Sequence, residues 1–130
     1  MTDLQYLLLS AALTWTMLMT SSLVRARAWT MPGLVLAFGN RDDLPPLTPL
    51  TGRLDRAARN MMENFVFFAV AVVVAHARGI EGAALALPCA VFFWARVLYF
   101  AVYAAGVTYL RTAIWLVGVA AIAWIGWIAW

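Results

Sequence analysis

The sequence predicts an all-α integral membrane protein, a bundle of four membrane-spanning helices. Hydrophobic residues make up 65% of the 130 residues and charged residues only 12%, whereas ordinary soluble domains carry roughly 45–50% and about 25%. The mean hydropathy of +0.86 leaves too few polar side chains to surround a soluble core. Disordered chains are poor in apolar residues, so the same composition excludes disorder.

Four segments are apolar enough to cross a bilayer, which takes about 20 residues of helix. A short chain in hydrocarbon can satisfy its backbone groups only as helix, and the alternation expected of barrel strands is missing. We expect one membrane domain over residues 1–130, with a long irregular loop over residues 25–53, where four of the five prolines fall. The expected helices are residues 4–24, 54–77, 83–106 and 113–130.

All nine basic residues are arginines, and six of them fall between residues 25 and 59. The positive-inside rule then places the loop 25–53 and the turn at Leu110–Thr112 in the cytoplasm, and both termini outside. We expect the protein to lie in an inner or cell membrane, with the site facing the cytoplasm. We expect membrane lipids, and not nucleic acid, among its partners. The region before the first apolar segment contains Asp3 and no basic residue, and the segment is too long for the apolar region of a signal peptide. We therefore expect it to be a retained helix.

The lone cysteine and the lone histidine predict no chemistry. Cys89 cannot form a disulfide within the chain or a cysteine-based metal site, and its apolar surroundings predict an inert thiol. His76 lies near the opposite end of its helix from the arginine cluster, and the sequence gives it no carboxylate neighbour. We therefore expect His76 to be neither a base nor a metal ligand, and we expect no metal.

Polar side chains inside the spanning helices require an explanation, because a charge deep in a bilayer costs about 2.5–3.5 kcal/mol or more. Arg96 lies about 15 Å from the nearest predicted end of its helix, and Tyr99 and Tyr103 follow on its face. On the preceding helix, spacings of three and four residues place a polar set on one face. That set is Arg56, Arg59, Asn60 and Glu63.

A purely structural interpretation is an Arg96–Glu63 ion pair that fixes the packing of two helices. It does not account for the whole set, because one carboxylate cannot neutralise Arg56, Arg59, Arg96 and the nearby Arg111. The surplus positive charge predicts an anionic ligand, and an oxygen-rich anion with two carboxylates and an ammonium group would match several arginines and one glutamate. For Arg111 alone, a positive charge anchoring a cytoplasmic loop remains the alternative.

Two patterns together resemble the MAPEG family, the membrane-associated proteins in eicosanoid and glutathione metabolism. The first is Arg56-Ala-Ala-Arg-Asn-Met-Met-Glu63, and the second is Arg96-Val-Leu-Tyr99-Phe-Ala-Val-Tyr103 followed by Arg111-Thr112. The resemblance covers essentially the whole chain. It implies a homotrimer of four-helix subunits, with sites between neighbouring subunits that open to the cytoplasm and the bilayer.

The resemblance further implies glutathione as co-substrate and lipophilic electrophiles as substrates of a transferase or peroxidase. Arg111 matches the family arginine beside the glutathione sulfur and would stabilise its thiolate. An arginine at the end of the first helix also takes part in the family, here Arg25 or alternatively Arg27. The remaining positions that match glutathione-binding residues are Arg56, Arg59, Asn60, Glu63, Arg96, Tyr99, Tyr103 and Thr112.

Departures from the family patterns leave the electrophile unspecified. Phe67 stands where several relatives have proline, and Tyr99 stands where some prostaglandin-type members have histidine. The family also includes a lipid-binding member without glutathione chemistry, so a non-catalytic lipid-binding protein is the alternative. A small multidrug transporter of similar length is disfavoured, because the first helix has no acidic residue beyond Asp3 at its mouth.

Overall fold

A computed structural model describes residues 1–130, which form five helices and no strand. The helices are α1 (Asp3–Ala26), α2 (Met31–Phe38), α3 (Pro49–Ala77), α4 (Ala83–Ala105) and α5 (Thr108–Ala129). All except α2 are long and apolar enough to cross a membrane. The predicted all-α membrane fold is confirmed, and the chain is an integral multi-pass membrane protein.

The segment 25–53 is not the long irregular loop that its prolines suggested. It contains α2, which begins where the Thr30 hydroxyl accepts a hydrogen bond from the Gly33 amide at 3.1 Å. It also contains the first turn of α3, which starts at Pro49 rather than near Leu54. Thr48 caps α3 by accepting from the Thr51 amide, and proline suits a first helical turn because its missing N–H is not needed there.

The turn between the last two helices also lies earlier than predicted. Gly106 ends α4 in the left-handed region, with φ of +85°, a conformation that glycine adopts without strain. Helix α5 begins at Thr108, so Leu110, Arg111 and Thr112 are helical rather than a turn. Placing Arg111 on a helix fixes the direction of its side chain relative to α4.

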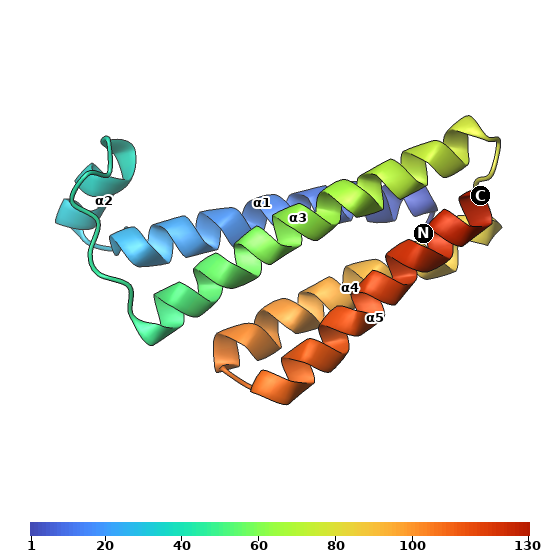
Figure 1. Cartoon of the computed structure of the whole chain (residues 1–130). Helices are drawn as coiled ribbons and strands as arrows, with labels where there is room; N and C mark the ends of the chain where they lie inside the picture. Colours follow the sequence, from blue (N-terminus) through green and yellow to red (C-terminus); the bar gives the residue numbers. More distant parts are fainter.

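The spanning helices pack as two antiparallel pairs, α1 with α3 and α4 with α5 (Figure 1). Contacts of α1 with α4, and of α3 with both α4 and α5, join the pairs. Both termini lie at one end of the bundle, and α2 lies at the other (Figure 1). In the core, the rings of Phe68 and Phe92 stack with centroids 4.0 Å apart.

Large apolar side chains also cover the outside of the spanning helices. Trp15, Phe67 and Trp94 are more than half exposed. Exposure of such side chains is unfavourable in water and favourable among lipid tails. The outer surface of this bundle is therefore the face expected to contact the bilayer.

At the end that carries the termini, His76 has the carboxylate neighbour that the sequence did not reveal. Its Nε2 lies 3.1 Å from Asp3 Oδ2, and Asp3 is only 3% exposed. The expectation of an isolated histidine was wrong because the partner comes from the start of α1, 73 positions away in the chain. The contact joins the first turn of α1 to the last turn of α3.

Candidate functional site

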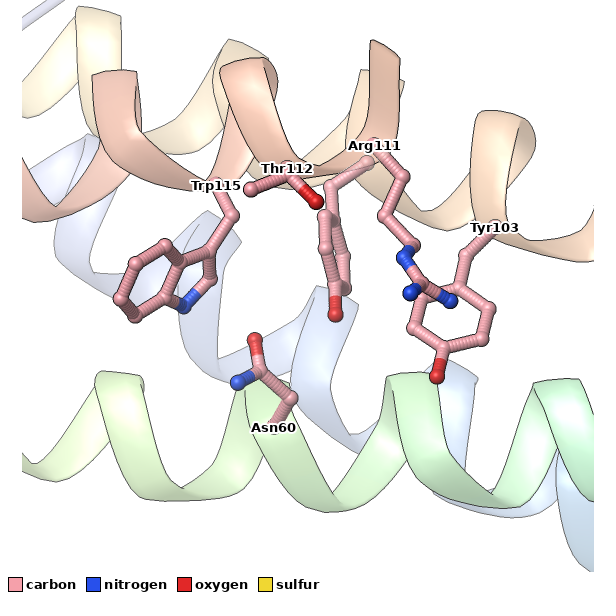
Figure 2. A pocket seen from close by; sticks show the side chains of 6 residues that line it. Asn60, Tyr103, Arg111, Thr112 and Trp115 are labelled. Atoms are coloured by element: carbon pink, nitrogen blue, oxygen red, sulfur yellow. The ribbon is translucent and has the colours of Figure 1, made fainter. Parts of the chain in front are cut away.

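A polar pocket opens where α3, α4 and α5 meet, towards the end of the bundle away from the termini (Figures 1 and 2). Its cavity volume is about 190 Å³. One lining residue comes from α3, two from α4 and three from α5. They are Asn60, Tyr99, Tyr103, Arg111, Thr112 and Trp115.

Tyr103 brings two guanidinium groups to one side of this pocket. The Arg111 Cζ lies 4.5 Å from the centroid of the Tyr103 ring, and Figure 2 shows the guanidinium over that ring. Arg56, on α3, donates from Nε to the Tyr103 hydroxyl at 3.1 Å. The ring of Tyr99 meets that of Tyr103 edge to face. The aromatic pair thus holds the positive charges beside the cavity.

Arg96 is buried behind the pocket and does not form the ion pair with Glu63 that was the structural alternative. Only 1% of the residue is exposed, and its guanidinium lies 5.1 Å from the centroid of the Phe92 ring. Its Nη1 donates to Asn60 Oδ1 at 3.2 Å and its Nη2 to Asn64 Oδ1 at 2.9 Å. Two neutral amides, rather than a carboxylate, therefore accept hydrogen bonds from this guanidinium, and its Nε is buried without a partner.

Two residues that support Arg96 were missed from the sequence. Asn64 follows Asn60 by one helical turn, and its own amide donates to the Asn60 carbonyl at 2.8 Å. Gly118, on α5, leaves room for the guanidinium, because a Cβ there would lie 2.8 Å from Arg96 Nη2. The i, i+4 spacing of the two asparagines was visible in the sequence, whereas the requirement for Gly118 depends on tertiary packing.

The arginines at the pocket carry positive charge that no carboxylate of the chain neutralises. The structure contains one arginine–carboxylate ion pair, Asp55 with Arg59 at 3.0 Å, and one close contact of a carboxylate with an imidazole, Asp3 with His76. Arg56, Arg96 and Arg111 have no carboxylate within 4.0 Å, and Glu63 has no basic partner. The pocket is thus an electropositive site in a low-dielectric surrounding, which favours an anion.

A second, mostly apolar pocket of about 460 Å³ adjoins the polar one, between α3 and α5. Asn60 and Trp115 line both pockets, and the indole N–H of Trp115 is buried without a partner. The sequence did not single out Trp115, which is one of seven tryptophans. The lining residues are Asn60, Glu63, Asn64, Phe67, Trp115, Val119, Ile122 and Ala123.

Four of the predicted site residues line neither pocket, and they are Arg25, Arg56, Arg59 and Arg96. The side chain of Arg59 is 71% exposed and pairs with Asp55 along its own helix. Arg25 is half-buried in the last turn of α1, and its Nε has no partner. Glu63 lines only the apolar pocket, and its residue surface is exposed. Within one chain, the predicted residues therefore form a site that is open on one side.

The structure gathers no group of three or more His, Cys, Asp or Glu side chains that could hold a metal ion. The polar groups at the pocket are guanidinium, amide and hydroxyl groups, which donate hydrogen bonds to oxygen-rich anions. The residues present fit an anionic organic ligand.

Fold and site together define a helical membrane protein with an open polar pocket, flanked by arginines, beside an apolar pocket. The family model described as "MAPEG family" matches residues 5–130 of the chain. The chain belongs to the MAPEG family, and it is a membrane protein of this glutathione- and eicosanoid-metabolism family. No curated protein and no solved structure matches the chain significantly.

Proposed function

We propose that the protein is a glutathione-dependent membrane transferase or peroxidase that acts on lipophilic electrophiles. The observation that carries this proposal is the unneutralised positive charge of Arg56 and Arg111, both held against Tyr103 at the polar pocket. Glutathione carries two carboxylates, one ammonium and a thiol. The arginines other than Arg111 would bind the carboxylates, and Glu63, which lines the adjoining apolar pocket, would bind the ammonium.

Arg111 is the proposed catalytic residue. A free thiol has a pKa of about 8.5, and a fixed guanidinium beside it favours the thiolate, which is the nucleophile. In a transfer, the thiolate forms a bond to an electrophilic carbon, and the leaving group departs with the electron pair. In a peroxidase reaction, two glutathione molecules reduce a hydroperoxide to an alcohol and water and become the disulfide.

The apolar pocket supports a lipophilic second substrate. It shares Asn60 and Trp115 with the polar pocket, so an electrophile in it would lie next to a thiolate at Arg111. Phe67 and Ile122 supply apolar contacts, and Phe67 is also exposed on the outside of the bundle. A substrate dissolved in the bilayer could enter there without crossing water.

We also propose that the working unit is a homotrimer, as the family implies. The polar cavity of about 190 Å³ is smaller than ordinary ligand pockets, which run from roughly 300 Å³ upwards. Glu63 and Arg59 are exposed in a single chain, and Arg25 reaches neither pocket. A neighbouring subunit that covers this open side would complete the site and could contribute its own Arg25.

Turnover by purified protein tests the proposed activity. We expect conjugation of glutathione to 1-chloro-2,4-dinitrobenzene, or reduction of a lipid hydroperoxide, by the wild type. Arg111→Ala should lose most of this activity, and Arg78→Ala, which removes an arginine at the other end of the bundle, should keep it. Equal activity of the two variants would remove the catalytic role of Arg111.

The alternative function is lipid binding without glutathione chemistry. The observation in its favour is that the apolar pocket, at about 460 Å³, is larger than the polar one. Lipid that copurifies with an intact oligomer, together with no glutathione binding at millimolar concentration, would favour this alternative.

A further inference from the structure

Helix α2 presents an apolar face that no other part of the chain covers. Met31, Val35 and Phe38 are 75%, 72% and 87% exposed, and their i, i+4, i+7 spacing places them on one side of the helix. The eight residues Met31–Phe38 include no charged side chain. Such a helix spans only about 12 Å, which is too short to cross a bilayer.

The position of α2 along the bundle is fixed by a close backbone contact. Gly33 is buried against the end of α1, where a Cβ would lie 2.1 Å from the Arg27 carbonyl oxygen and 2.4 Å from that of Ala26. Only glycine permits this approach. Figure 1 shows α2 inclined across the end of α1 rather than continuing along it. Helix α2 is therefore held at the depth of the last turn of α1.

That depth corresponds to the surface of the membrane. Helix α1 has 24 residues, and at 1.5 Å per residue its length of about 36 Å exceeds the roughly 30 Å of the hydrocarbon core. Its last turn thus reaches the headgroup region. Trp29, 70% exposed, lies between α1 and α2, and tryptophan is enriched at this level of a bilayer.

Three arginines lie near the last turns of α1, to which α2 is attached. Arg25 and Arg27 end α1, and Arg41 donates from Nη1 to the Ser22 hydroxyl at 2.8 Å, which holds its charge near the last turns of α1. Guanidinium groups beside an apolar face suit lipid phosphates, whereas the dry core of a subunit interface is depleted of charge. Asp42 and Asp43 follow Arg41 and are exposed, so the segment has little net charge.

We propose that α2 is an interfacial helix whose face of Met31, Val35 and Phe38 lies in the bilayer surface, within the headgroup and upper acyl region. The occupant of the exposed face is therefore phospholipid. Because the net charge is small, the apolar face rather than anionic lipid holds the helix in place. Attachment of α2 keeps the connection from α1 to α3 on the membrane, at the same end of the bundle as the polar pocket.

The depth of a fluorescent label on α2 tests this proposal without reference to catalysis. The full chain carrying Val35→Cys is labelled with an environment-sensitive maleimide and placed in phosphatidylcholine vesicles with nitroxides at the headgroup or deep in the acyl chain. Cys89 is fully buried, and the unsubstituted protein measures its residual labelling. Trp15→Cys, on the middle of α1, is the deep control, and Asp43→Cys is the aqueous control.

We expect shallow nitroxides to quench the Val35 label more than deep ones, and iodide to quench it less than the Asp43 label. Adding Phe38→Asp should shift the label towards water, whereas Leu47→Asp, outside α2, should not. Iodide quenching of Val35 equal to that of Asp43 would overturn the proposal. Protection from both iodide and lipid nitroxides would also overturn it, because the face would then contact a second copy of the chain.

Discussion

Arg96 carries the most deeply buried charge of the chain, and its hydrogen-bond partners are two asparagines rather than an acid. The guanidinium donates to Asn60 and Asn64, and Asn60 also lines the polar pocket. Because Arg96 takes up the Asn60 oxygen, the Asn60 amide N–H₂ is left to donate to a ligand. Arg96 thus acts on the pocket through Asn60 and lines neither cavity itself.

Replacing Asn64 tests how the buried guanidinium is stabilised. Asn64→Leu removes one acceptor from a buried cation and should lower the free energy of unfolding by about 1.5–3 kcal/mol, the value of a hydrogen bond to a charged group. Asn64→Asp keeps an acceptor and adds an opposite charge, so it should lose less. Thermal unfolding in detergent, followed by circular dichroism, measures both. Equal losses in the two variants would contradict the role of the acceptor.

The patterns in the sequence located the residues of the site better than their partners. Asn60, Tyr99, Tyr103, Arg111 and Thr112 were singled out from helical spacing and family resemblance, and all five line one cavity. Asn64 and Trp115 were not, because their importance depends on contacts between helices. Arg59 was also expected at the site, but its side chain pairs with Asp55, four residues earlier on the same helix.

At the scale of the helices, Gly118 of α5 leaves the space that the Arg96 side chain of α4 occupies. Gly118 faces the Arg96 guanidinium, whereas a Cβ at Gly126 would meet nothing within 4 Å. Both glycines lie inside α5, where alanine is favoured over glycine by about 1 kcal/mol. Gly126→Ala should therefore be neutral or stabilising.

Gly118→Ala should displace the guanidinium from Asn60 and weaken glutathione binding relative to both the wild type and Gly126→Ala. Calorimetric titration with glutathione measures the difference. If the two alanine variants bind glutathione equally, the contact between Gly118 and Arg96 does not position Asn60.

We assign the apolar pocket between α3 and α5 to the lipophilic substrate. Ala123 lines the apolar pocket, and Ala120 on the same helix is exposed and lines neither pocket. Ala123→Trp should fill the pocket and raise the KM for a long-chain electrophile, with glutathione affinity unchanged. Ala120→Trp is the matched control. Steady-state kinetics with short and long electrophiles measures these KM values. Equal KM values of the two variants for the long electrophile would contradict the assignment.

Element boundaries were the part of the fold that the sequence predicted least well. Apolar segments of sufficient length predicted the four spanning helices, because the bilayer sets that length. The start of α3 at Pro49 and the existence of α2 depend on the caps Thr48 and Thr30, which lie among prolines that favoured a loop. The Asp3–His76 contact joins distant parts of the chain, and no local pattern announces it.

For the whole molecule, the arginines predict an orientation in the membrane. Asp43, in the connection from α2 to α3, and Glu81, between α3 and α4, are exposed acidic residues at opposite ends of the bundle. In intact cells, a membrane-impermeant maleimide should label Glu81→Cys and not Asp43→Cys, because the positive-inside rule places the arginine-rich end in the cytoplasm. Labelling of Asp43→Cys alone would show that the protein has the opposite orientation in the membrane.

For the whole molecule, the central claim is that arginines without carboxylate partners bind glutathione and hold its sulfur as a thiolate. The most direct measurement is the ultraviolet absorbance of thiolate when glutathione is added at neutral pH to the purified protein. We expect the signal for the wild type and for Arg78→Ala, and its loss for Arg111→Ala. An intact wild-type oligomer that gives no thiolate signal at saturating glutathione, or an Arg111→Ala variant that keeps the full signal, would contradict the claim.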